Sequence, residues 1–302
     1  MSRRPIAEKR TTAKPTIAIV GAGSLANFLA VALRDAGFRI SEIIARDSPQ
    51  SFRRARALAA KVDAQAVTAR SAALDTALLW FCVPDREIRR AASFLADHVL
   101  GRALVGQKVI VRFALHSSGT FSSRELDALR TAGAAVASAH PLMTFVAGAH
   151  PSLKGVPFAV EGDHEATRVA RRIVRALGGN SFTLPASRKA AYHAWATLTS
   201  PLLLAFLVTL EDAARAAGLT PQDARSKSLP IIRQTLENYS RLGPARSFSG
   251  PLVRGDAETV AKHLAALKKQ PGASEVYMAL ARAALHGLPV KNLKELTRLL
   301  RN

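Results

Sequence analysis

The chain has 302 residues, of which 48% are hydrophobic and 22% are charged, and it contains 18 Gly, 15 Pro and one cysteine. This length is typical of two domains, and the composition excludes a disordered chain, a collagen-like fibre and a scaffold built on disulfides. The net charge of +21 makes nucleic acid, anionic membranes and acidic ligands candidate partners. The alternative is a general bias in amino-acid usage, because Arg and Ala are abundant throughout the chain.

Two features of the sequence bear on where the protein resides. Residues 1–14 carry five Lys and Arg side chains but no apolar segment, which predicts a disordered basic leader and not a signal peptide. The longest apolar stretch, residues 202–210, is shorter than the ~20 residues of a membrane-spanning helix. We therefore expect a cytoplasmic protein that does not span a membrane.

Short strands and amphipathic helices alternate over the first 160 residues. The apolar patterns predict strands at residues 16–20, 39–45, 64–68, 77–83, 108–114 and 134–139. Helices are predicted between them at residues 25–36, 51–61, 85–99 and 122–132. This alternation is typical of a doubly wound parallel sheet, to which residues 157–161, 165–177 and 181–184 would add elements at the edge.

From about residue 186 the pattern becomes helical throughout. Helices are predicted at residues 187–217, 221–241, 257–269 and 274–285, with Gly and Pro residues at the breaks between them. The predicted fold is therefore an α/β domain over residues 15–185, followed by an all-helical domain over residues 186–302.

A glycine-rich turn joins the first predicted strand to the first helix. Its form is G-x-G-x-x-A, made by Gly21, Ala22, Gly23, Ser24, Leu25 and Ala26. In such a turn the first glycine permits a tight bend, the second lets the backbone approach a pyrophosphate, and the small last residue lets helix and strand pack closely. The spacing predicts a dinucleotide site formed by these six residues; the alternative is an ordinary tight strand-to-helix turn.

The end of the second strand bears on which dinucleotide binds. NAD-preferring sites usually place an acidic residue there to bind the ribose 2′-hydroxyl, whereas this chain places Arg46 first. Because a guanidinium group fits a 2′-phosphate, NADP(H) is the predicted cofactor and NAD(H) the alternative. Asp47 weakens this preference, since it could pair with Arg46 or meet a free hydroxyl.

Three further strand ends carry residues that would meet at one edge of the sheet. Val83 and Pro84 end the strand at 77–83, His116 and Ser117 follow the strand at 108–114, and His140 follows the strand at 134–139. Ligands of open α/β sheets bind outside the carboxyl ends of the strands. We therefore expect the first four residues to bind the cofactor and His140 to bind substrate; the alternative is that they only stabilise turns.

The first helix of the helical region presents Lys189 and His193 on one face, because they lie four residues apart. With Tyr192 beside them they are candidate catalytic residues, since reduction of a C=O or C=N bond needs a hydride from a cofactor and a proton at the heteroatom. The alternative is a solvent-exposed face. Further along, Arg254 is a candidate for binding an anionic substrate.

Five motifs together resemble a family that joins a Rossmann-like domain to a helical domain of unknown function, number 2520 in its series. They are HSSG at residues 116–119, HPLMTF at 140–145, FAVEGD at 158–163, KAAYHA at 189–194 and GPLVRGD at 250–256. The resemblance extends, more distantly, to pyrroline-5-carboxylate reductases, β-hydroxyacid dehydrogenases and deazaflavin-dependent NADP oxidoreductases. It implies an NAD(P)-binding fold and a helical domain that commonly builds a homodimer. One position departs from the family, because Pro201 follows Ser200 where members typically have Asn.

These observations predict an NADP(H)-dependent oxidoreductase that reduces a C=O or C=N bond of a small anionic metabolite in the cleft between the domains. The departure at Pro201 keeps a second function in view, a nucleotide-binding regulator that performs no chemistry. Nucleic-acid binding ranks last, because no zinc finger, helix-turn-helix or aromatic RNA-binding motif is present. No metal site is predicted, because the eight histidines are scattered and no H-E-x-x-H or cysteine cluster occurs.

Overall fold

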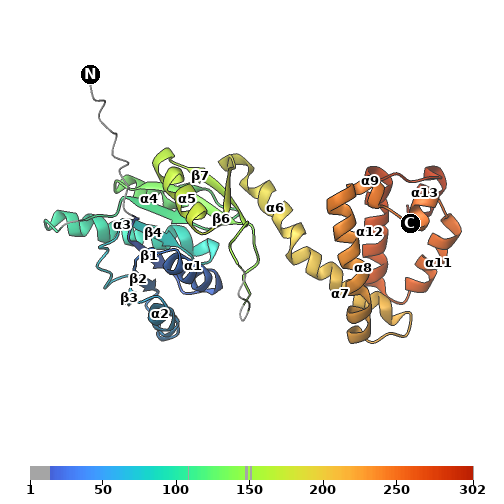
Figure 1. Cartoon of the computed structure of the whole chain (residues 1–302), viewed down its shortest axis with the longest axis horizontal. Helices are drawn as coiled ribbons and strands as arrows, with labels where there is room; N and C mark the ends of the chain where they lie inside the picture. Colours follow the sequence, from blue (N-terminus) through green and yellow to red (C-terminus); the bar gives the residue numbers. More distant parts are fainter. Residues whose placement is uncertain (1–13, 108, 147–148, 150–151, 302) are drawn as a thin grey trace, which may run out of the picture. The chain divides into compact units, whose positions relative to one another are not determined.

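The computed structural model describes residues 14–107, 109–146, 149 and 152–301. It divides into two compact units, Met1–Ala196 and Thr197–Asn302, each of which is described by itself (Figure 1). The predicted basic leader lies outside the described residues, except for Lys14.

The first unit is built on one eight-stranded sheet of order β3-β2-β1-β4-β5-β6-β7-β8. The strands are β1 (Ile17–Val20), β2 (Ile40–Ala45), β3 (Gln65–Thr68), β4 (Leu78–Phe81), β5 (Phe113–His116), β6 (Ala135–Pro141), β7 (Pro157–Gly162) and β8 (Asn180–Thr183). β1 and β4 are buried along their whole length, as expected for central parallel strands covered on both faces. The predicted doubly wound sheet is confirmed.

One strand direction differs from the prediction of a parallel sheet. β6 and β7 pair antiparallel, while β7 and β8 are again parallel to each other. A parallel neighbour needs a crossover connection, usually a helix, and the described part of the connection from β6 to β7 contains no helix. The chain therefore reverses direction at β7, and the sheet is mixed.

Helices cover both faces of this sheet. They are α1 (Ser24–Asp35), α2 (Pro49–Lys61), α3 (Ile88–Leu104), α4 (Asp127–Thr131) and α5 (His164–Ala176), with the short 3₁₀ turns η1 (Asp85–Glu87) and η2 (Ser123–Leu126). The 3₁₀ turn η3 (Ala186–Arg188) and α6 (Lys189–Thr199) follow β8 and supply no side chain to either core cluster. One core cluster takes its helical side chains from α1, α2 and α5, including Leu29, Leu58 and Ile173. The other takes them from α3 and α4, including Leu95 and Leu129, so the sheet has a core on each side.

The second unit is helical, as predicted. It contains α7 (Pro201–Arg215), α8 (Pro221–Leu242), α9 (Pro244–Ser247), α10 (Pro251–Arg254), α11 (Ala257–Leu267), α12 (Pro271–Gly287) and α13 (Leu293–Leu299). The helix predicted at residues 187–217 is broken at Ser200, because Pro201 takes the first position of a new helix, where its missing N–H costs nothing. α9, α10 and α13 were not predicted.

Few apolar residues of the second unit are buried. Its buried core cluster consists of Val260, Ala281, Leu296 and Leu300, and no residue of α7 is buried. One stretch of the described residues, Ala186–Arg215, is long and apolar enough to cross a membrane by length and composition alone, which the sequence pattern did not predict. Core helices of soluble proteins and signal sequences pass the same test, and no residue of the apolar window in this stretch is buried in the described part of the chain.

Candidate functional site

The turn between β1 and α1 leaves an open helix N-terminus. Gly21 has φ +109°, and a Cβ there would lie 2.5 Å from the carbonyl oxygen of Cys82, so only glycine fits. Gly23 differs, because a Cβ added to it would have no neighbour within 4 Å. Gly23 precedes the first residue of α1, and no side chain caps the helix. The first amides of α1 therefore face open space, which is the arrangement that binds phosphate.

A cavity of about 630 Å³ adjoins this turn at the carboxyl edge of the sheet. The predicted cofactor residues Gly21, Ala22, Gly23, Arg46, Val83 and Pro84 line it. It is also lined by residues outside the predicted cofactor set, among them Ser48, Arg54, Arg70, Arg90 and Phe94. Position in sequence offers a signal for two of them, since Ser48 follows β2 and Arg70 follows β3 at the same edge of the sheet.

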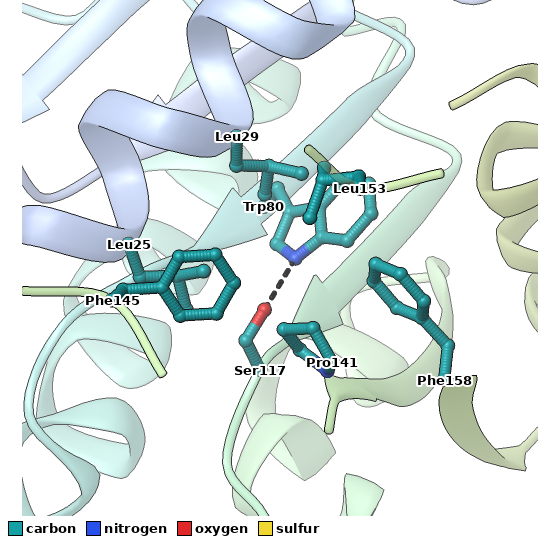
Figure 2. Close-up of a pocket in the computed structure, with 8 residues that line it drawn as sticks. All are labelled: Leu25, Leu29, Trp80, Ser117, Pro141, Phe145, Leu153 and Phe158. Carbon is teal, nitrogen blue, oxygen red and sulfur yellow. Dashed lines mark hydrogen bonds between the residues drawn. The ribbon is translucent and has the colours of Figure 1, made fainter. Parts of the chain in front are cut away.

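Four of the predicted cofactor residues face the protein interior instead. Ala26 is fully buried in the core, and Leu25 lines a small apolar gap (Figure 2). Figure 2 shows the Ser117 hydroxyl accepting a hydrogen bond from Trp80 Nε1 at 2.9 Å. His116 is also fully buried; its Nδ1 accepts the Ser118 amide at 3.1 Å, and its Nε2 lies 2.9 Å from the Ser122 carbonyl oxygen. These four side chains therefore do not line the cavity of about 630 Å³.

The single cysteine lies next to this buried group. Burial raises the pKa of the Cys82 thiol to about 12, although a hydrogen bond with Ser117 opposes the shift. A thiol with such a pKa stays protonated at neutral pH, so Cys82 acts as a structural residue, as its apolar sequence context indicates.

Two histidines and two hydroxyl groups form a compact polar cluster above β5 and β6. His140 Nδ1 lies 2.8 Å from the Tyr192 hydroxyl, and His193 Nδ1 lies 2.7 Å from Thr120 Oγ1. The two imidazole rings meet edge to face with centroids 6.0 Å apart. Gly119 makes this approach possible, because a Cβ there would lie 2.4 Å from His193 Cδ2 and 2.9 Å from His140 Nε2.

The protonation states of this cluster follow from its surroundings. Burial, together with the positive charge of Lys189 and the neighbouring histidines, lowers the pKa of His140 to about 3. Burial raises the pKa of Tyr192 to about 12. At neutral pH the pair therefore consists of a neutral imidazole and a protonated phenol, which together can hold and pass on one proton.

Lys189 lies on the same side of α6 as His193 but deeper. Its side chain is 1% exposed, and its ammonium group donates to the Ser118 carbonyl oxygen at 2.9 Å and to Ser138 Oγ at 2.6 Å. Burial lowers its pKa to about 8, while the charges of Glu161 and Asp85 oppose the shift. The predicted Lys–His face thus points at the loop after β5 and not into solvent.

That loop is held by groups that the sequence analysis did not identify. The Ser118 hydroxyl donates to Asp85 Oδ2 at 2.8 Å and accepts hydrogen bonds from the Thr120 and Phe121 amides. Further along, the Glu161 carboxylate accepts the Ser123 amide at 2.6 Å and its hydroxyl at 3.0 Å. Ser118 and Glu161 belong to the motifs at residues 116–119 and 158–163, which is the signal that the sequence offers for these pairings.

Two other expectations concern the substrate and metals. Arg254, the last residue of α10, is exposed in the second unit, whereas His140 belongs to the first. Within the part of the chain that the structure describes, no group of three or more His, Cys, Asp or Glu side chains is arranged to hold a metal ion.

Comparison with known structures agrees with this fold. Protein BF3122 from Bacteroides fragilis, named provisionally as an NADP oxidoreductase, is 22% identical, with 89% of this chain and 97% of that chain covered and a TM-score of 0.71. Protein TM1727 from Thermotoga maritima is 23% identical over 95% and 100% of the two chains, with a TM-score of 0.67. A reductive aminase from Aspergillus terreus in complex with NADPH and ethyl-5-oxohexanoate is 16% identical over 96% and 100%, with a TM-score of 0.61. At these identities the likeness shows the fold.

Family models match two successive segments of the chain. Residues 16–106 match the model described as NADP oxidoreductase, coenzyme F420-dependent, which agrees with the expected oxidoreductase class and NADP preference. Residues 156–284 match the model of a domain of unknown function, DUF2520. No curated protein sequence matches the chain significantly. The resemblance to proteins that join a Rossmann-like domain to domain of unknown function 2520 is therefore confirmed.

Proposed function

We propose that the protein is an NADP(H)-dependent oxidoreductase that reduces a C=O or C=N bond of a small anionic metabolite. The observation that carries the proposal is the uncapped N-terminus of α1, where Gly21 is packed against Cys82 and Gly23 is open, beside a cavity of about 630 Å³. A dinucleotide pyrophosphate fits this place, because it needs free backbone amides and room for close approach. Gly21, Ala22, Gly23 and Ser24 would hold it.

The basic side chains of the same cavity favour a phosphorylated ribose. Arg46 and Arg54 line it together with Ser48, whose hydroxyl accepts the Ser51 amide and caps α2. Guanidinium groups at the end of β2 bind a 2′-phosphate better than a free hydroxyl. The reductive aminase named above was crystallised with NADPH, and the family model over residues 16–106 describes NADP oxidoreductases. NADP(H) is therefore the proposed cofactor, with NAD(H) as the alternative.

When bound, the cofactor supplies a hydride, and the chain supplies the proton that the reduced heteroatom needs. Tyr192 carries a proton at neutral pH and lies against His140, while His193 lies against Thr120. We assign proton delivery to Tyr192 or His193, with His140 holding the Tyr192 hydroxyl in place. Lys189 is better suited to positioning, because its ammonium group is buried on Ser118 and Ser138. Arg254 is the proposed partner of an anionic substrate group.

A second candidate function is nucleotide binding without chemistry. It is favoured by Ser200 and Pro201, which interrupt the helix at the position where the resembling family has Asn. If that Asn binds substrate in the family, this chain lacks the contact but keeps the dinucleotide cavity.

A homodimer through the second unit is the proposed assembly. Helices α7 and α8 expose Leu204, Ile231 and Leu236, each of them more than half exposed. A helical unit whose buried core cluster has four residues leaves apolar surface that a second copy can cover. Because the same apolar surface of each copy would be buried against the other, the contact is expected to be symmetric.

The test is binding followed by turnover. Isothermal titration calorimetry with NADPH, NADH and the reduced deazaflavin coenzyme should show tightest binding of NADPH. Loss of absorbance at 340 nm should then depend on an added carbonyl or imine compound. Binding of NADPH without turnover across a broad panel of such compounds would favour the regulator, and absence of binding by all three would refute both functions.

A further inference from the structure

The cavity beside α1 is walled on one side by a basic turn that follows β3. The Thr68 amide donates to Ser71 Oγ at 3.0 Å, and the Ser71 amide donates to the Thr68 carbonyl oxygen at 3.1 Å. These bonds close a tight turn with Arg70 as its third residue. Because β2 and β3 pair in parallel with Ala45 opposite Thr68, the turn lies beside the residues that follow β2.

Arg70 has two contacts within this cavity. Its Nε lies 3.7 Å from Asp47 Oδ2, and its guanidinium carbon lies 5.9 Å from the ring centroid of Phe94 on α3. Arg70, Asp47 and Phe94 all line the cavity. Both side chains of the ion pair are 75% exposed. The turn and the face of the Phe94 ring therefore place the guanidinium at the cavity wall, and burial does not.

Asp47 stands where a carboxylate normally selects against a phosphorylated ribose. An acidic side chain after β2 accepts a hydrogen bond from the ribose 2′-hydroxyl and repels a 2′-phosphate. Asp47 forms a solvent-exposed ion pair with Arg70, which offsets part of its charge, while Arg46 and Arg54 also line the cavity. The other acidic residue that lines the cavity, Glu87, lies 3.8 Å from Arg86.

We propose that Arg70 determines cofactor specificity by neutralising Asp47, which turns a site with an NAD-type carboxylate into one that accepts a 2′-phosphate. This inference rests on the proposed function, because it concerns the same dinucleotide cavity. It adds a residue that the glycine motif and Arg46 do not indicate, and it assigns the role of Asp47 that the sequence leaves open.

The test is a double-mutant cycle read by isothermal titration calorimetry with NADPH and with NADH. Arg70→Ala should weaken NADPH binding about tenfold, because an unpaired carboxylate then faces the 2′-phosphate, while NADH binding stays within about twofold. Asp47→Asn added to Arg70→Ala should return NADPH binding to within about threefold of the unmodified protein, because the repulsive charge is gone. Arg56→Ala is the matched control, since it removes an exposed arginine of α2 that does not line the cavity.

The outcomes separate this inference from the function on which it rests. If the unmodified protein binds NADPH but Arg70→Ala weakens both cofactors equally, or if Asp47→Asn gives no recovery, Arg70 is not the determinant. If Arg56→Ala weakens NADPH binding as much as Arg70→Ala does, the loss of one positive charge from the protein explains the effect, and the inference is overturned. If the unmodified protein binds neither NADPH nor NADH, the proposed function itself fails and the inference fails with it.

Discussion

Lys189 and Ser138 lie in hydrogen-bond contact, with 2.6 Å between the ammonium nitrogen and the hydroxyl oxygen, and both side chains are buried. This contact ties α6 to β6, and the second bond of Lys189, to the Ser118 carbonyl oxygen, ties it to the loop after β5. The residue that the sequence offers as a proton donor thus holds together the elements that carry His140, Tyr192 and His193. A buried cation in such a place is costly unless its partners are all present.

Truncation of Lys189 should therefore destabilise the first unit. Lys189→Ala should lower the free energy of unfolding by about 2–4 kcal/mol, because it removes the buried methylenes of the side chain and leaves a cavity. Lys189→Met, which keeps the volume, should cost about 1 kcal/mol or less, because the cost of burying the charge disappears together with its bonds. Urea unfolding followed by tryptophan fluorescence reads this unit, since both tryptophans, Trp80 and Trp195, lie in it. The exposed Arg188→Ala is the control; equal effects of all three variants would contradict the role.

Substitution of Gly21 should mainly reduce stability, whereas substitution of Gly23 should mainly reduce NADPH binding. Gly21→Ala should destabilise the first unit by about 2 kcal/mol or more, because its φ is positive and the added Cβ meets the Cys82 carbonyl. Gly23→Val should cost about 1 kcal/mol, as a weaker helix cap, yet abolish NADPH binding, because its side chain fills the space for the pyrophosphate. Thermal unfolding and calorimetry measure the two effects. Gly101→Ala, inside α3, also enters open space; it should leave NADPH binding unchanged and raise stability by about 0.5–1 kcal/mol, because alanine has the higher helix propensity. Retained NADPH binding by Gly23→Val would argue against the site.

Substitution of Gly119 should reduce turnover without changing cofactor binding. In Gly119→Ala the added methyl group overlaps the His193 and His140 rings, which must move away from Thr120 and Tyr192. Turnover should fall at least about tenfold with any accepted substrate, while the Kd for NADPH stays unchanged, because displacement of a proton-transfer group acts on the chemical step. NMR spectra of the imidazole nitrogens should show both histidines shifted. Unaltered imidazole signals would count against the arrangement.

Acid should weaken the first unit through its buried histidines. Burial, with the charge of Lys189, lowers the pKa of His116 from 6.5 to about 4, although the hydrogen bond to Ser122 opposes the shift. The unfolded chain therefore takes up this proton first as the pH falls below 6.5. The contribution to the free energy of unfolding is complete above that pH and decreases by about 3 kcal/mol as the pH falls toward 4.

Urea unfolding at pH 7 and pH 4.5 measures this loss. His116→Asn should lose less stability between the two pH values than the unmodified protein does, whatever its absolute stability, because it lacks the titrating ring. The exposed His164→Asn should keep the full loss. The same loss in both variants would show that His116 does not carry the effect.

The exposed apolar residues of the second unit should govern assembly. Leu204→Glu or Ile231→Glu should convert a dimer to a monomer in sedimentation experiments, because each places a charge on apolar surface that a second copy would cover. Leu104→Glu, at a still more exposed position in the first unit, is the control and should leave the assembly unchanged. A wild-type protein that sediments as a monomer at all concentrations would rule the dimer out.

Much of the fold follows from local sequence. The strand before Gly21, the helix after it and the fully apolar strand at β4 each carry a periodicity that one kind of element satisfies. The break before Pro201 follows from a missing N–H. The antiparallel direction of β7 was missed, because direction depends on the connecting segment and the edge to which the strand adds, and neither leaves a local pattern.

The residues of the candidate site likewise fall into those that local sequence indicates and those that it does not. Gly21, Gly23 and Arg46, which line the cavity, could be proposed from the sequence because a dinucleotide site requires particular residue types at fixed distances along the chain, and a sequence records such distances directly. The burial of Lys189, the pairing of Tyr192 with His140 and the ion pair of Arg70 with Asp47 join residues that are distant in sequence or on separate elements. Only tertiary structure decided these, because desolvation and hydrogen-bond partners, which set a side chain's charge and role, depend on what packs around it.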